Sequence, residues 1–127
     1  MDNVVVLAHD EEVRIDGRAL AVLQAQLGSA GAEGVISRAV EEIANRLSLI
    51  ERAHAQRERD ALWKTSKGLI GIAEQIGLVD LARVSRDVSQ CARGRDDVAL
   101  SAVLARLIRL GDRSVTTVWG MADISNF

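Results

Sequence analysis

The strongest constraint on the fold is a run of apolar residues in the first half of the chain, spaced alternately by four and three positions. The run consists of Ile36, Val40, Ile43, Leu47, Ile50 and His54. This spacing places one stripe along a helix, where it can face a partner helix. Because the chain contains no proline, helices of this length meet no forced interruption. The sequence therefore favours a protein built from long amphipathic helices.

Similar patterns predict further helices on both sides of this stripe. Asp16 can cap a first helix that ends at Gly28, and residues 28–34 are the expected linker. We expect the helices to cover about residues 16–27, 36–54, 60–76, 78–91 and 97–119. No segment reads convincingly as a strand. The expected fold is all-α, an up-and-down antiparallel four-helix bundle with a short additional N-terminal helix.

Length and composition indicate one domain spanning residues 1–127. Nearly half of the chain is hydrophobic, which is enough to form a core at this size. Residues 1–14 are expected to be flexible or partly ordered, and residues 120–127 form a C-terminal tail. The apolar run Val4 to Ala8 is too short for a membrane span or a signal peptide. We therefore expect a cytoplasmic protein without a membrane partner, and the single Cys91 fits a reducing compartment.

Charge and side-chain chemistry exclude several function classes. The net charge is −2 and the charges are interspersed, so nucleic acid is not an expected partner. His9 and His54 are the only histidines, and no Cys/His cluster or glycine-rich phosphate loop is present. Ser101 and Ser114 have no histidine neighbour that the sequence identifies. We expect no metal, no cofactor and no ordinary catalytic site.

The predicted helix at 60–76 has a second face beside its apolar stripe. That face holds Trp63, Lys67, Ile70 and Glu74. Apolar side chains around one charge suggest a docking patch, and Gly68 and Gly71 would keep the surface beside Lys67 low for an approaching protein. Alternatively, Trp63 and Ile70 belong to a broad core stripe and the glycines allow close helix packing. Spacing alone leaves both interpretations open.

The spacing of leucines and glycines in this region resembles that of histidine phosphotransfer (Hpt) domains. In that family a histidine is followed by leucine two residues on, lysine three on, glycine four on and a second glycine ten on. With Gly71 as the first glycine, the matching residues are Leu69, Gly71, Gly77, Leu78 and Leu81. Ile15 to Gly28 is also similar to the family's first helix, so the resemblance extends from about Ile15 onward. It implies a phosphorelay protein of two-component signalling, whose partner is a response-regulator receiver domain or a histidine kinase.

The sequence departs from the Hpt pattern at the residues that perform the chemistry. Lys67 occupies the position of the phosphoacceptor histidine, and Ile70 replaces the lysine that steadies the phosphoryl group. An exposed lysine is almost wholly protonated at neutral pH and offers no lone pair to a phosphoaspartate. A second register places Lys64 at the histidine position and Gly68 on the first glycine, but it loses the second glycine. Neither register supplies a histidine.

The resemblance therefore predicts docking on a receiver domain without phosphotransfer. The expected docking residues are Trp63, Lys64, Lys67, Gly68, Ile70, Gly71 and Glu74. Two other functions remain open. His54 could act as the phosphoacceptor, or the chain could be a helical oligomerisation module. We expect the chain to be a monomer in solution or, if it is such a module, a homodimer. In the second case the tail residues Trp119, Met121, Ile124 and Phe127 would need cover.

Overall fold

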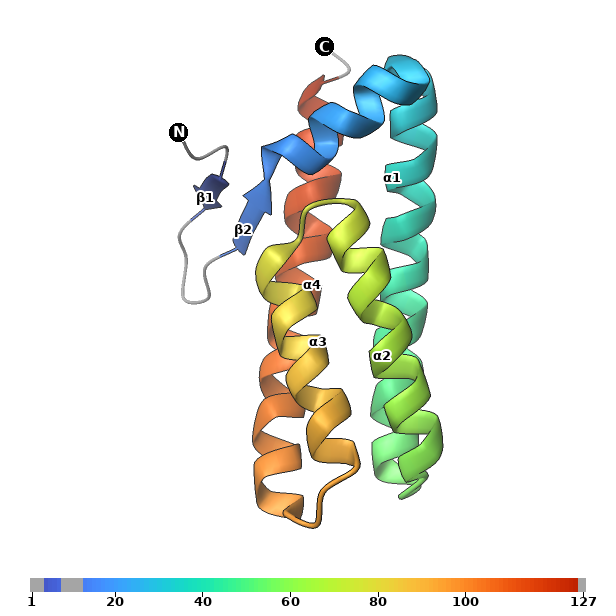
Figure 1. Cartoon of the computed structure of the whole chain (residues 1–127), viewed down its shortest axis with the longest axis vertical. Helices are drawn as coiled ribbons and strands as arrows, with labels where there is room; N and C mark the ends of the chain where they lie inside the picture. Colours follow the sequence, from blue (N-terminus) through green and yellow to red (C-terminus); the bar gives the residue numbers. More distant parts are fainter. Residues whose placement is uncertain (1–3, 8–12, 126–127) are drawn as a thin grey trace.

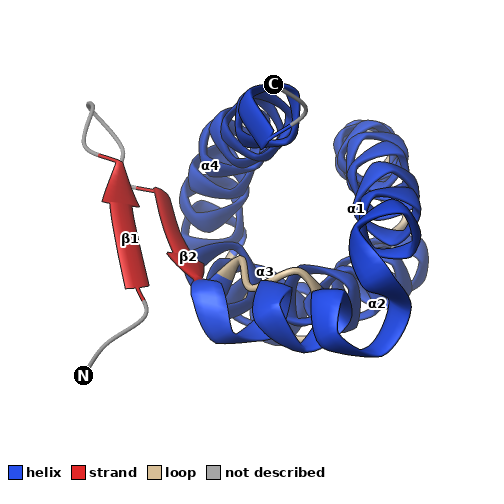
Figure 2. Cartoon of the chain, turned by 90° about the horizontal axis from the view of Figure 1, so that it is seen from above, coloured by secondary structure: helices blue, strands red, loops and turns tan. Residues whose placement is uncertain are grey.

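Four helices form an up-and-down bundle in the computed structural model of the chain (Figure 1). The structure describes residues 4–7 and 13–125, with the side chains of residues 13–120. The helices are α1 (Gly17–Ala55), α2 (Arg59–Gln75), α3 (Val79–Ala92) and α4 (Asp97–Ser125). Seen from above, they follow one another around the bundle in chain order (Figure 2). The predicted all-α four-helix fold is confirmed.

The core consists of the apolar stripes read from the sequence. Five residues at helical spacing along α2 and its C-cap are buried, namely Leu62, Ser66, Leu69, Ala73 and Ile76. The Ser66 hydroxyl donates a hydrogen bond of 2.8 Å to the Leu62 carbonyl, so its burial leaves no unpaired group. From α1, Ile43, Leu47 and Ile50 are buried against the same core. Because this stripe is covered within the chain's own bundle, it is not available to an intermolecular one.

A glycine on α4 allows that helix to approach α1 closely. Gly111 is buried, and a Cβ at this position would lie 2.5 Å from Leu47 Cδ1. The Leu47 side chain therefore fills the space that any larger residue on α4 would occupy.

The expected short N-terminal helix is not a separate element, because it forms the first part of α1. Asp16 caps this part by accepting a hydrogen bond of 3.0 Å from the Arg18 backbone N–H. At Gly28, φ is 73° and ψ is 174°, and the first part lies at an angle to the rest of α1 (Figure 1). The linker predicted for residues 28–34 is wrong beyond Gly28. A helical glycine costs only about 1 kcal/mol, so this segment continues as helix and Ala32 is buried.

Two short strands that the sequence analysis did not predict precede the bundle. β1 (Val4–Leu7) and β2 (Val13–Asp16) form an antiparallel pair in which Val5 lies opposite Ile15. Val13 and Ile15 of β2 are buried in the common core. A two-stranded hairpin is marginally stable by itself. Here β2 is supported by contacts with α3 and α4, which a local reading of four residues does not reveal.

The turn between α2 and α3 holds β2 in place. The Asp16 N–H donates a hydrogen bond of 2.7 Å to the Gly77 carbonyl. Gly77 ends α2 with φ of 78°, as predicted, and a Cβ there would lie 2.5 Å from the Asp16 carbonyl oxygen. Glycine is required both by the left-handed backbone and by this close approach.

The last helix also differs from its predicted end. α4 passes Gly120 and continues to Ser125, because one glycine is too weak a signal to end a helix. Trp119 is 47% exposed, whereas the side chains of Met121, Ile124 and Phe127 lie outside the described residues. Within the described part of the chain, no helix combines the length and apolar character needed to cross a membrane.

Candidate functional site

The exposed side of α2 carries a lysine next to an aromatic ring. Lys67 is exposed, and its Nζ lies 4.6 Å from the centre of the Trp63 ring, one turn earlier on the helix. The Arg93 Cζ, from the residue that caps the end of α3, lies 3.8 Å from the same ring centre. Both are cation–π contacts. Trp63 therefore connects α2 to the end of α3 and holds two cations near the surface.

The predicted docking residues divide into half-buried and exposed groups. Trp63 and Ile70 are half-buried and pack against the core, while Gly68 is partly covered. Lys64, Lys67, Gly71 and Glu74 are exposed. We call the surface formed by Trp63, Lys64, Lys67 and Gly71 the Lys67 face. Its apolar parts are anchored in the core, and its charged groups remain accessible to a partner.

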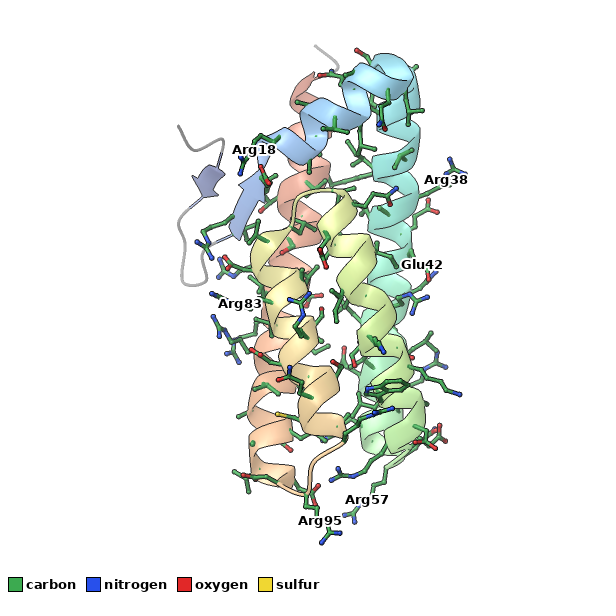
Figure 3. The ribbon with its side chains drawn as sticks, viewed as in Figure 1. Arg18, Arg38, Glu42, Arg57, Arg83 and Arg95 are labelled. Atoms are coloured by element: carbon green, nitrogen blue, oxygen red, sulfur yellow. The ribbon has the colours of Figure 1, made fainter. Side chains whose placement is uncertain are left out.

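Gly68 makes room for a side chain of α1. A Cβ at Gly68 would clash with the guanidinium of Arg46, lying 2.9 Å from Cζ. Arg46 is held there by a 2.8 Å hydrogen bond from Nε to Glu42 and by a 3.3 Å bond from Nη1 to the Thr65 carbonyl. Glu42 projects from the outer side of α1 (Figure 3). The clearance at Gly68 therefore accommodates a side chain of the same molecule.

At position 71, no contact within the described part of the chain requires a glycine. It is exposed, and a Cβ at this position would meet no atom within 4 Å. In mid-helix it costs about 1 kcal/mol relative to alanine. Gly71 lies four residues after Lys67, which puts it on the same side of α2. The missing side chain lowers the surface next to the lysine without improving any packing.

The Lys67 face is positively charged. Lys64, Lys67 and Arg93 form no ion pair with any residue that the structure describes. The acid expected in the patch, Glu74, interacts instead with Arg86 of α3 at 3.4 Å. This surface therefore favours an acidic partner.

His54 lies in a pocket at the end of the bundle where the α1–α2 turn faces the start of α4. The pocket has a volume of about 440 Å³ and is lined by apolar residues together with His54, Arg57, Glu58, Arg59, Asp97 and Ser101. Arg59 pairs with Asp97 and donates to the carbonyls of α3's C-terminal end. Neither Trp63 nor Lys67 lines this pocket. The structure thus separates His54 from the Lys67 face.

Ser101 does have a histidine neighbour, which the sequence analysis could not identify. Its Oγ lies 3.4 Å from His54 Nε2. The two residues are 47 positions apart and meet only because α1 and α4 are neighbours in the bundle. Among the described residues, no carboxylate bonds to His54 to orient it, so the pair is not a catalytic triad.

Arg46 is the residue at this site that sequence reasoning missed. The available signal is Glu42 four residues earlier, a spacing typical of helix-surface ion pairs. That spacing does not show that the guanidinium reaches α2. In the described part of the chain, no group of three or more His, Cys, Asp or Glu residues could hold a metal ion.

Comparisons with known proteins return no match to any family model, curated protein or solved structure. Functional inference must therefore come from the residues and their geometry.

Proposed function

We propose that the chain is an Hpt-like signalling protein that binds receiver domains through its Lys67 face and transfers no phosphate there. The observation that carries this proposal is the pairing of an exposed Lys67 with Gly71, whose missing side chain no internal contact requires. The bundle architecture agrees with the Hpt resemblance, and α2 carries Lys67, Leu69, Ile70 and Gly71 of the motif. The same surface would allow the protein to compete with an active phosphotransfer protein or a histidine kinase for the receiver.

Electrostatics supports binding without transfer. By the Hpt resemblance, the partner offers a pocket of carboxylates that holds a magnesium ion. Lys67 would place an ammonium group where the imidazole of an active Hpt domain enters. Lys67 and Arg93 both lie at the Trp63 ring and have no acidic partner among the described residues, so their attraction is available to the receiver. Such complementarity raises association rates and selects partners. Ile70 supplies no cation to steady a phosphoryl group.

A binding assay with matched charge reversals tests the proposal. Receiver domains from the same organism are titrated by calorimetry with the wild type, Lys67→Glu and Arg38→Glu. Arg38 is an exposed residue of α1 that points away from the bundle and forms no ion pair among the described residues (Figure 3). We expect Lys67→Glu to weaken binding at least about tenfold and Arg38→Glu to leave it nearly unchanged. Equal affinities for wild type and Lys67→Glu, or no binding of any receiver, would refute the proposal.

Phosphotransfer through His54 is a second candidate. The observation favouring it is the position of His54 in a pocket lined by two arginines, Arg57 and Arg59, which are cations suited to a phosphoryl group. The wild type and His54→Ala are incubated with a small phosphodonor, and acid-labile phosphate is measured. Label on the wild type that His54→Ala lacks would support this function. An unlabelled wild type would exclude it.

A further inference from the structure

The Arg46 guanidinium is fixed in position but keeps unused hydrogen-bond donors. A guanidinium has five N–H groups. Arg46 uses Nε toward Glu42 and one donor of Nη1 toward Thr65, and no other hydrogen bond is found to a described residue. Its side chain is 28% exposed. Both terminal nitrogens thus retain donors, and part of the side chain is accessible from outside.

Gly68 makes this position possible. The planar group lies against the α2 backbone, with Cζ 2.9 Å and Nη2 3.3 Å from the place where a Cβ would be. Any side chain at residue 68 would displace it. A mid-helix glycine costs about 1 kcal/mol relative to alanine. At Gly68, the absence of a side chain allows an arginine to lie against α2.

Arg46 adds a cation from α1 to the Lys67 face. The guanidinium lies against α2 at Gly68, which follows Lys67 directly and lies one turn after Lys64. Arg93, which caps the end of α3, is a further cation of this region and lies at the Trp63 ring. Glu42 is the acid paired with this group, and it is bound at Nε.

We propose that Arg46 is a specificity-determining residue of the Lys67 face and binds a carboxylate side chain of the protein partner. This inference rests on the proposed docking function. The planar fork of a guanidinium matches a carboxylate with two parallel N–H donors, whereas Lys67 acts as a point charge. Because Arg46 is already held by Glu42 and Thr65, little side-chain freedom is lost on binding. Arg46 therefore distinguishes receivers that carry an aspartate or glutamate at this position from those that do not.

Receiver binding provides the first test. Affinities of several receivers are measured for the wild type, Arg46→Lys, Gly68→Ala and the control Arg38→Lys. Arg46→Lys keeps the charge and removes the fork, so we expect about tenfold weaker binding, while Arg38→Lys has no effect. Gly68→Ala displaces Arg46 without changing Lys67 or Gly71 and should weaken the same receivers. Unchanged affinity of Arg46→Lys for every receiver that binds the wild type would overturn the inference while the docking proposal stands.

A second test does not need a receiver. The side-chain Nε–Hε signals of the arginines are followed by nuclear magnetic resonance during titration with acetate. We expect a saturable shift of the Arg46 signal that is absent in Gly68→Ala, with circular dichroism confirming that this variant is folded. An Arg46 signal that moves no more than that of Arg38 would overturn the inference. If no receiver binds but the acetate shift is present, the docking proposal fails and carboxylate recognition by Arg46 is retained.

Discussion

Two clusters of positive charge on this molecule have opposite surroundings. At the hairpin end, Arg14 and Arg83 surround Asp80, a carboxylate only 7% exposed. On the Lys67 face, Lys67 and Arg93 have no acid among the described residues. A cation cluster that contains its counter-ion joins elements of the fold. One that lacks a counter-ion gains little for stability and retains its attraction for a partner.

The Asp80 cluster connects β2 to α3. Arg14 donates to Asp80 from Nε at 2.8 Å and from Nη2 at 2.5 Å, and Arg83 lies at 3.1 Å. In Figure 3, Arg83 lies on the hairpin side of the bundle. These hydrogen bonds from Arg14 lower the pKa of Asp80, with further lowering by the charges of Arg14, Arg83 and Arg106, although burial acts in the opposite direction. The carboxylate therefore stays ionised at neutral pH.

We expect the largest loss of stability when the Asp80 carboxylate is removed. Asp80→Ala removes the acceptor of two hydrogen bonds from Arg14 and the ion pair with Arg83, and it should lower the free energy of unfolding by about 3 kcal/mol. Urea denaturation measures the change. Asp87→Ala is the control, because Asp87 is on the same helix and has no ion pair with a described residue. A loss for Asp80→Ala no greater than that for Asp87→Ala would contradict the assigned role.

Gly77→Ala is expected to be the next most destabilising change. It forces alanine into a left-handed backbone and drives its Cβ against the Asp16 carbonyl, so we expect a loss of about 2 kcal/mol. Thermal unfolding measures it. Gly34→Ala, at an exposed helical glycine with open surroundings, should not destabilise. Wild-type stability of Gly77→Ala would show that the hairpin does not depend on this turn.

Acid should remove part of the Asp80 effect. Because the folded-state pKa is lowered, Asp80 contributes its full stabilisation above its unfolded value of 3.8 and loses it as the pH falls through the folded value. We therefore expect the stability difference between wild type and Asp80→Asn to be constant above about pH 5 and to narrow below pH 4. Urea midpoints across this range measure it. If the stability difference between wild type and Asp80→Asn became larger in acid, the lowered pKa of Asp80 could not be its cause.

The smallest expected change in stability concerns Gly71. This change also gives the clearest contrast in receiver binding, with Gly34→Ala as the control. Gly71→Ala should stabilise α2 by up to about 1 kcal/mol, because nothing opposes a Cβ there. Gly34→Ala should give a similar gain. If the low surface beside Lys67 admits a partner, Gly71→Ala weakens receiver binding and Gly34→Ala does not. Undiminished binding by Gly71→Ala would mean that the partner does not approach the helix at this point.

Much of the fold could be predicted because its signals are local. Ile43 and Leu47 are buried where the apolar spacing placed them, Asp16 caps the first part of α1, and Gly77 ends α2. The hairpin could not be predicted, since Val13 and Ile15 acquire their burial from helices far along the chain. Two weak signals were overestimated. The glycines that follow Gly28 do not end a helix, and neither does Gly120. In each case a continuous helix outweighs a cost of about 1 kcal/mol.

The candidate site was located by sequence only in part. Spacing identified Lys67 and Trp63 on one face, but it could not decide how much of Trp63 is covered. It also could not bring Ser101 to His54 or Arg46 to Gly68, because these contacts join different helices.

By itself, the sequence determined that the chain forms long helices and which sides of those helices are apolar, because both follow from the periodicity of neighbouring residues. It also determined that no histidine lies in the motif of α2. Only the tertiary structure showed that Gly68 and Gly71 have different surroundings. The two glycines carry the same backbone cost within one helix, but one receives an arginine from α1 and the other faces open space. That difference depends on which side chain another helix places next to the glycine, and the sequence around the two glycines does not show this.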